Sequence, residues 1–405
     1  YQSLSTNTGG FANAAFGNQS LLLNTTGYQN TALGFGALRV NTSGYNNTAT
    51  GLGALYLNTT GNSNTGYGYS SLASNTTGNN NTAVGNLAML SNTKGYSNVA
   101  MGVSALSSNT IKSNLVAVGD SALYNNGKNL INESDATANT AIGSKSLFSN
   151  TAGAFNTATG FNTLRDNTTG SSNTAVGWSA LLHNINGLRN TATGAGSLDH
   201  NIDGNYNTAN GSFTLGTNKA GSYNTAYGVQ ANYTNQNGSF NTSSGCFALI
   251  SNLSSDNTAV GYEAISANIN GDGNTAVGKQ SMKSGTAGFQ NTAAGYQSMY
   301  NNAANYNTAF GTQALYSNTN GNGNVALGSF AGYSWTGIAF CTLAGYGADV
   351  NANSLFNATA IGWDAIVDGS NKVRVGNSFV TSIGGYANWT NVSDGRVKKN
   401  IKANV

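Results

Sequence analysis

Apolar and polar positions along this chain recur with a 17-residue period, occasionally shortened by one position. The clearest unit is the pentad Asn-Thr-Ala-x-Gly, whose Asn we number position 0 of the repeat. Position +2 is almost always Ala, +8 is usually Leu, and Asn returns at +11, followed by Thr and by Gly at +14. The complete pentad begins at Asn30, Asn47, Asn81, Asn139, Asn156, Asn173, Asn190, Asn207, Asn224, Asn257, Asn274, Asn291 and Asn307.

This period predicts an all-β fold, a β-solenoid (β-roll) of 17-residue coils. The repeat is too short for a pair of helices, and glycine at two fixed places per repeat opposes helix formation. We expect each coil to hold a short strand, a Gly bend, a second short strand around Ala-Leu, and an Asn-Thr-x-Gly turn. Both glycines are expected at positive φ. About 22 coils spaced by ~4.8 Å would make a rod on the order of 100 Å long.

The same pattern predicts what holds the coils together. One coil cannot bury its own Leu and Ala, so stacking must create a continuous core. The almost constant Ala at +2 indicates a tightly enclosed position, whereas +3 accepts Val84, Thr159 or Tyr227 and therefore faces something less restrictive. Stacked Asn residues at 0 and +11 are expected to form amide ladders along the column.

The regularity of the repeat divides the chain into three parts. Residues 1–328 form the regular shaft, with an extra loop at about 120–138, where seven additional residues separate Gly119 from Gly143. Residues 329–392 are expected to form irregular coils at a tip, and residues 393–405 begin a separate segment. Leu4 lies one full repeat before Leu21, so the chain begins inside a coil and is expected to belong to a longer protein.

The amino-acid composition excludes several other classes of protein. Charged residues make up 7% of the chain and proline is absent, against about 25% charge in an ordinary globular domain. Four of the 16 basic and one of the 13 acidic residues lie in 394–405, so the remainder carries 12 of each sign and has no nucleic-acid footprint. No apolar run approaches membrane-spanning length, and we expect no membrane insertion. Disorder, the alternative for such polar sequence, is disfavoured by the strict register of the apolar residues.

The pentad resembles the inner strand of trimeric autotransporter adhesin heads, and the whole repeat resembles the arrays of phage-type tail fibre proteins. Residues 393–401, Ser-Asp-Gly-Arg-Val-Lys-Lys-Asn-Ile, resemble the start of the intramolecular chaperone of the S74 (endosialidase-type) peptidase family. This resemblance implies a homotrimer, folding assisted by a C-terminal chaperone, and self-cleavage between Ser393 and Asp394. Ser393 would be the nucleophile and Lys398 the base. The alternative is that residues 393–405 simply start a linker helix.

Other candidate sites are few. Trp335, Trp363 and Trp389 gather where the repeat loosens, and we expect them to bind a cell-surface glycan or another surface receptor. His183 and His200 stand at the same position of successive repeats near Asp199, but with no evident third ligand we expect no metal site and no cofactor.

Cys246 and Cys341, far apart along the chain, have no metal or redox spacing. Tyrosines recur at the ends of the repeats, at Tyr28, Tyr45 and Tyr223 among others. They are expected to pack against neighbouring coils or chains.

The sequence thus predicts a structural fibre or adhesin shaft that presents a receptor-binding tip. It would belong to a virion tail fibre or to an extracellular cell surface, and it would not be an enzyme beyond the self-cleavage. Two alternatives remain. One is an ice-binding solenoid that uses the Thr row at +1, and the other is a self-assembling extracellular filament without a receptor.

Overall fold

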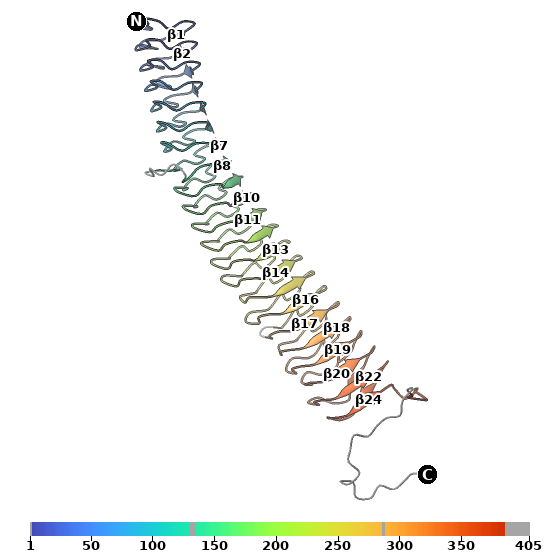
Figure 1. Cartoon of the computed structure of the whole chain (residues 1–405). Coiled ribbons are helices and arrows are strands. Elements are labelled where there is room, and N and C mark those ends of the chain that lie inside the picture. The colour runs from blue at the N-terminus through green and yellow to red at the C-terminus, as the bar shows by residue number, and fades with distance from the viewer. Residues whose placement is uncertain (1, 129–134, 286–287, 385–405) are drawn as a thin grey trace, which may run out of the picture.

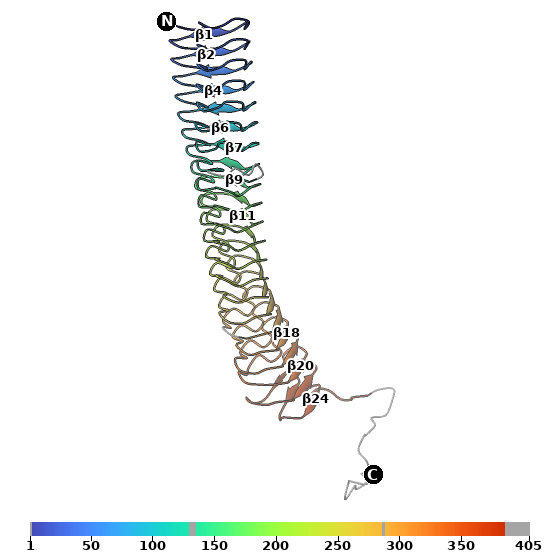
Figure 2. The ribbon, with the colours of Figure 1, turned by 60° about the vertical axis from the view of Figure 1, so that its left-hand side comes forward.

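The coils of the chain stack into one elongated rod. The computed structural model describes residues 2–128, 135–285 and 288–384. Successive coils lie one above another from the N-terminal to the C-terminal end (Figure 1), and a second view shows that the rod is bent rather than straight (Figure 2). Within the described residues there is no helix, so no segment there could cross a membrane as a helix.

Each regular coil contributes one three-residue strand to a 22-stranded parallel sheet, in which every strand pairs with the one from the next coil. Two further short strands, β21 and β23, pair with each other in a separate sheet near the C-terminal end. The strands are β1 (Ala14–Phe16), β2 (Thr31–Leu33), β3 (Thr48–Thr50), β4 (Thr65–Tyr67), β5 (Thr82–Val84), β6 (Val99–Met101), β7 (Val116–Val118), β8 (Thr140–Ile142), β9 (Thr157–Thr159), β10 (Thr174–Val176), β11 (Thr191–Thr193), β12 (Thr208–Asn210), β13 (Thr225–Tyr227), β14 (Thr242–Ser244), β15 (Thr258–Val260), β16 (Thr275–Val277), β17 (Thr292–Ala294), β18 (Thr308–Phe310), β19 (Val325–Leu327), β20 (Thr342–Ala344), β21 (Asp349–Val350), β22 (Thr359–Ile361), β23 (Ile366–Val367) and β24 (Val373–Val375).

Residues at the same repeat position lie directly above one another. Between β2 and β3, for example, Thr31 pairs with Thr48 and Ala32 with Ala49. Because side chains alternate along a strand, the Ala at +2 points inward and is fully buried at Ala49, Ala83 and their counterparts. Positions +1 and +3 point outward. The predicted all-β solenoid with 17-residue coils is confirmed.

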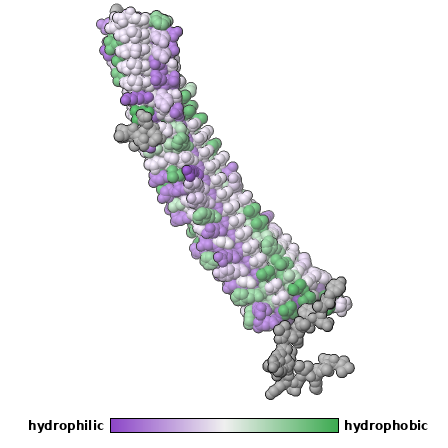
Figure 3. All heavy atoms as spheres, in the orientation of Figure 1, coloured by the Kyte–Doolittle hydropathy of each residue, from purple (hydrophilic) through white to green (hydrophobic). Residues whose placement is uncertain are grey.

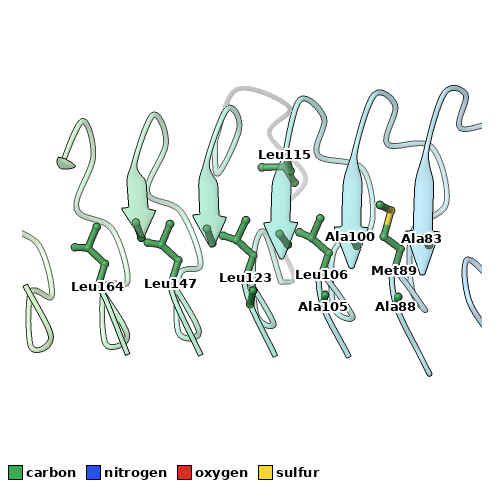
Figure 4. Close-up of a cluster of buried hydrophobic side chains, with 14 of the residues drawn as sticks. Ala83, Ala88, Met89, Ala100, Ala105, Leu106, Leu115, Leu123, Leu147 and Leu164 are labelled. Carbon is green, nitrogen blue, oxygen red and sulfur yellow. The ribbon is translucent and has the colours of Figure 1, made fainter. Parts of the chain in front are cut away.

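The core is a single column of small and medium-sized side chains. In Figure 4 the +8 residues point into this column, from Met89 through Leu106 and Leu123 to Leu147 and Leu164, and Leu115 adds a second large side chain in the coil of Leu123. These side chains are completely buried, as are the alanines beside them. One Leu and two Ala per coil enclose little by themselves. Each coil therefore depends on its neighbours for stability, as in other repeat proteins.

The predicted second strand is wrong for the regular coils. The Leu at +8 adopts a left-handed backbone conformation, with φ of 50° at both Leu38 and Leu55. The segment still stacks, because the N–H of Leu38 donates to the carbonyl of Ala54 at 3.0 Å. An extended strand replaces this turn only in the last coils, at β21 and β23. There β-branched Val350, Ile366 and Val367, which resist positive φ, stand at +8 and +9.

The two glycines of the repeat have different physical roles. At +4 the prediction is confirmed, since φ lies between 118° and 142° from Gly17 to Gly362. At +14 it is wrong, because those glycines have no positive φ. There the constraint is space: a Cβ on Gly44 would lie 2.4 Å from Oδ1 of Asn41 and 2.5 Å from the carbonyl oxygen of Gly61. No side chain fits between the stacked turns at this coil.

The predicted amide ladders are present and completely buried. At +11 the side-chain amide of Asn41 donates to Oδ1 of Asn24 at 2.8 Å and to the carbonyl of Gly44 at 2.9 Å. At position 0 the backbone N–H of Asn47 donates to Oδ1 of Asn30 at 3.0 Å. The Asn30 amide donates to the same carbonyl of Gly44 at 2.8 Å. Both ladders thus close each coil at its +14 residue.

The coil with seven extra residues keeps this closure on either side of its insertion. Residues 129–134 of that loop lie outside the described residues. The side-chain amide of Asn126 donates to the carbonyl of Ala136 at 2.9 Å, across the insertion. In the preceding coil Lys112 replaces the +14 glycine, and its side chain is fully buried beside Gly127.

Candidate functional site

Large apolar side chains are exposed in two adjacent rows that follow the main sheet along the rod. They stand at positions +3 and +5, on either side of the Gly bend, and we call these two rows the outer stripe. Figure 3 shows hydrophobic side chains at the surface at many levels of the rod, with several near its C-terminal end. The large exposed members are Phe16, Leu33, Phe35, Leu52, Tyr67, Tyr69, Met101, Val103, Ile142, Phe161, Val176, Trp178, Tyr227, Val229, Val260, Tyr262, Val277, Tyr296, Phe310, Leu327, Tyr346, Ile361, Trp363 and Val375.

The outer stripe is almost free of charge. Among the residues at +3 and +5 in the described coils, only Asp120 and Lys279 carry one. The register of the sheet places each +3 residue against the next, as Leu33 lies against Thr50. The stripe runs through most coils and is interrupted at β11 and β12, where Thr193, Ala195, Asn210 and Ser212 stand at +3 and +5. Extended exposed apolar surface of this kind is unusual for a monomer and is typical of an interaction surface.

Trp363 stands in the outer stripe close to the C-terminal end of the described rod. Its side chain is 58% exposed, and its ring stacks on Phe379 with centroids 6.3 Å apart. The side-chain amide of Asn377 donates to the Trp363 carbonyl at 2.9 Å, which ties the two segments together. Beside the ring lies an open hollow of about 450 Å³, whose apolar lining includes Val375 and Val380.

Trp335 has a structural position instead. It stands at +11, where the preceding coil carries the ladder residue Asn318. Its indole N–H donates to the carbonyl of Val350 at 2.6 Å, and its half-buried ring packs against the core. The structure thus places Trp335 and Trp363 at different positions of their coils. Trp389, Ser393 and Lys398 lie outside the described residues.

Asp349 is a buried carboxyl group beside Trp335. Its Oδ1 accepts the Val350 N–H at 2.8 Å and its Oδ2 accepts the Ser334 N–H at 3.2 Å. Burial raises the pKa of this carboxyl, and these hydrogen bonds oppose the rise. Asp349 accepts hydrogen bonds from this turn, and the nearby thiol of Cys341 is itself a buried group whose pKa is raised mainly by burial.

The tyrosines at the ends of the repeats stack on one another between coils. The rings of Tyr28 and Tyr45 are parallel with centroids 4.8 Å apart, and those of Tyr206 and Tyr223 are 4.9 Å apart. These rings pack against neighbouring coils, and their stacked faces are covered. They are therefore poorer candidates for sugar stacking than Trp363.

Part of this surface could be found from the sequence. The tolerance of +3 for large residues was a usable signal. The row at +5 was missed, because it alternates Phe35, Tyr69 and Trp178 with small or polar residues such as Ser212. Only the register of the structure joins the two rows into one surface.

The fold and repeat define the class of this protein: it is an all-β repeat protein, a parallel β-solenoid with 17-residue coils. No protein-family model matches the chain, and no curated protein matches it. The resemblance to tail fibres and to the S74 chaperone segment stays a prediction.

Proposed function

We propose that this chain is the shaft of a homotrimeric fibre or adhesin that holds a receptor-binding tip away from a virion or a cell surface. The observation that carries the proposal is the outer stripe, which follows the sheet from Phe16 to Val375. A rod with one long apolar face exposes that face to water unless other chains cover it.

Three copies arranged around an axis would cover all three stripes at once. The stripe recurs in most coils and is nearly uncharged, so identical chains can meet in register without burying unpaired charge. The number three comes from the resemblance of the repeat to trimeric adhesin heads and tail fibres. A bundle of this kind would be long and stiff, which suits a spacer.

The association state tests the shaft proposal. We expect the chain to sediment as a trimer, and the double variant Tyr227→Asp with Val260→Asp to sediment as a monomer with an unchanged circular dichroism spectrum. The matched control is Asn237→Asp with Asn270→Asp, which adds the same charge at exposed positions of the same coils outside the stripe. A monomeric native chain would overturn the proposal, and a stable dimer would keep the stripe as an interface but reject the trimer.

For the tip, we propose that the C-terminal end of the outer stripe stays uncovered in the trimer, so that Trp363 and the hollow beside it contact a surface glycan or another receptor. Exposed aromatic rings beside open space suit sugar stacking. Replacing Trp363 by Ala is expected to abolish attachment to receptor-bearing cells without changing the assembly. Attachment equal to that of the native fibre would reject this role.

The maturation step is a separate proposal. Ser393, activated by Lys398, would cut the chain before Asp394 in a precursor that contains the chaperone. Ser393→Ala should then leave such a precursor uncut, and cutting at the normal rate would reject the assignment.

Ice binding remains the second candidate because the Thr row at +1 is in register along the sheet. The neighbouring +3 row varies between Ser244 and Tyr227, which makes a poor flat lattice. Measured thermal hysteresis would favour this alternative, and its absence would dismiss it.

A further inference from the structure

Two histidines and an aspartate meet on the side of the rod at adjacent coils. His183 and His200 stand at +10 of successive coils, and their rings stack with centroids 4.9 Å apart. Asp199 reaches both of them. Its Oδ1 lies 3.4 Å from Nδ1 of His183, and its Oδ2 lies 3.4 Å from Nδ1 of His200.

Oxygen atoms lie close to Nδ1 of both rings. Nδ1 of His183 also lies 3.3 Å from the Asp199 carbonyl oxygen, and Nδ1 of His200 lies 3.2 Å from the Gly216 carbonyl oxygen. Both carbonyl oxygens already accept a backbone N–H, from His183 at 2.9 Å and from His200 at 3.2 Å. Oδ1 of Asp199, by contrast, is buried and has no hydrogen-bond partner among the described residues.

We propose that His183, Asp199 and His200 bind a divalent transition-metal ion of the Zn²⁺ type. Zinc–nitrogen and zinc–oxygen bonds of about 2.0–2.1 Å at tetrahedral angles place neighbouring ligand atoms about 3.3–3.4 Å apart. Each imidazole already has one Asp199 oxygen at this distance, Oδ1 for His183 and Oδ2 for His200. All three ligand atoms lie within 4.8 Å of one another. Rotation of the partly exposed imidazoles would shorten the remaining distances between these atoms to the spacing that the ion requires.

The surroundings suit this assignment. Binding through Nδ1 requires the proton of each ring on Nε2. Nε2 of His183 lies 3.8 Å from Oδ2 of Asp166, so a second carboxylate stands near this nitrogen without a hydrogen bond to it. Arg165 holds Asp166 in place with two hydrogen bonds of 2.8 and 2.9 Å. Imidazole ligands select zinc, copper or nickel over calcium and magnesium.

A hollow of about 220 Å³ adjoins the two rings, lined by Asp166, His183, Ile185, His200, Ile202 and Lys219. Asp199 is not among its lining residues, so the hollow gives the two rings open space for reorientation and does not itself define the ligand position. An ion at this place would join two coils that are otherwise held by backbone hydrogen bonds and the amide ladder. The metal would therefore act as a local clip in the shaft, and it does not depend on the proposed fibre function.

The experiment is a calorimetric titration in which Zn²⁺ alone is added to the chelator-treated native chain. We expect one ion per chain and no binding of Mg²⁺ under the same conditions. His183→Ser and His200→Thr introduce residues that other coils carry at +10, Ser74 and Thr217, so the coil should still form. Each of these variants, and Asp199→Asn, is expected to weaken binding at least tenfold.

Asp203→Asn is the matched control, because it removes the same charge from an exposed position in the same coil as Asp199 and should leave the affinity unchanged. X-ray absorption at the zinc edge of the loaded chain should show two imidazole ligands. Absence of stoichiometric zinc binding, or native affinity in His183→Ser with an intact circular dichroism spectrum, would overturn the proposal.

Discussion

The side-chain amide of Asn58 donates to Oδ1 of Asn41, one coil away, at 2.8 Å. The same amide donates to the carbonyl of Gly61 at 3.0 Å, and Oδ1 of Asn58 accepts the amide of Asn75 at 2.7 Å. The three asparagines are completely buried. These buried hydrogen bonds connect successive coils along the rod. We expect them to contribute to the stability of the fold.

Interrupting the ladder should be costly. Asn58→Ala leaves the Asn41 oxygen, the Gly61 carbonyl and the Asn75 amide each short of a buried partner. We expect a loss of about 3 kcal/mol in the free energy of unfolding, measured by denaturant titration at a fixed chain concentration. Asn210→Ala, at an exposed strand position, is the control and should change little. Equal losses in both variants would contradict the role of the ladder.

The two glycines on either side of Leu52 should lose different amounts of stability when each is replaced by Ala. In Gly51→Ala the new methyl would lie 2.6 Å from the Gly68 carbonyl oxygen, at a φ of 129°. We expect a loss of more than about 3 kcal/mol. In Gly53→Ala the methyl meets only the Ser70 hydroxyl at 3.5 Å, at a φ of 68°. This change should stay within about 1 kcal/mol, since other coils carry side chains there. Thermal unfolding of the pair checks the ranking, which a reversed order would refute.

Leu55 is expected to tolerate Met better than Val. Its φ is 50° and its side chain is fully buried. Leu55→Val removes one buried methylene and puts a β-branched residue into a left-handed conformation, for an expected loss of about 2–3 kcal/mol. Leu55→Met should cost less than about 1.5 kcal/mol, because Met89 occupies the same position with the same φ. The chain carries Ile265 at one such position, with φ of 46°, so branching is costly without being forbidden. Losses of equal size in the two variants would contradict this account.

Asp349 should make stability depend on pH. Burial raises the pKa of its carboxyl in the folded chain, so the folded state retains this proton at a pH at which the unfolded chain has lost it. Stability then falls as pH rises from the ordinary Asp range, near 3.9, through the raised value. Asp349→Asn should remove this component. We expect the difference in melting temperature between Asp349→Asn and the native chain to grow in favour of the variant over that interval. A difference that stays constant with pH would show that the burial of Asp349 has no such effect.

Several features of the fold could be predicted because they repeat. A 17-residue spacing of Ala, Leu, Asn and Gly can be satisfied only if equal positions stack, so the parallel solenoid and both amide ladders followed from the pattern. The turn at Leu38 could not be predicted, because Leu is compatible with strands and rarely adopts positive φ. It does so here because the stacked coils bury its side chain and bond its N–H to Ala54. The sequence placed Asp199 near His183 and His200, but only the stacked coils show that its carboxylate reaches both imidazoles.

The sequence by itself determined the length of the coil, its stacking in register and the polar ladders within it, since local spacing dictates these whenever each coil meets an identical neighbour. Only the tertiary structure decided which residues leave the strand conformation, why glycine is needed at +14 of coils such as that of Gly44, and which outward rows lie side by side at the surface. The physical reason is that these outcomes depend on distances between coils. Two turns pressed together exclude a Cβ at Gly44, and neighbouring coils bring Asp199 to two imidazoles.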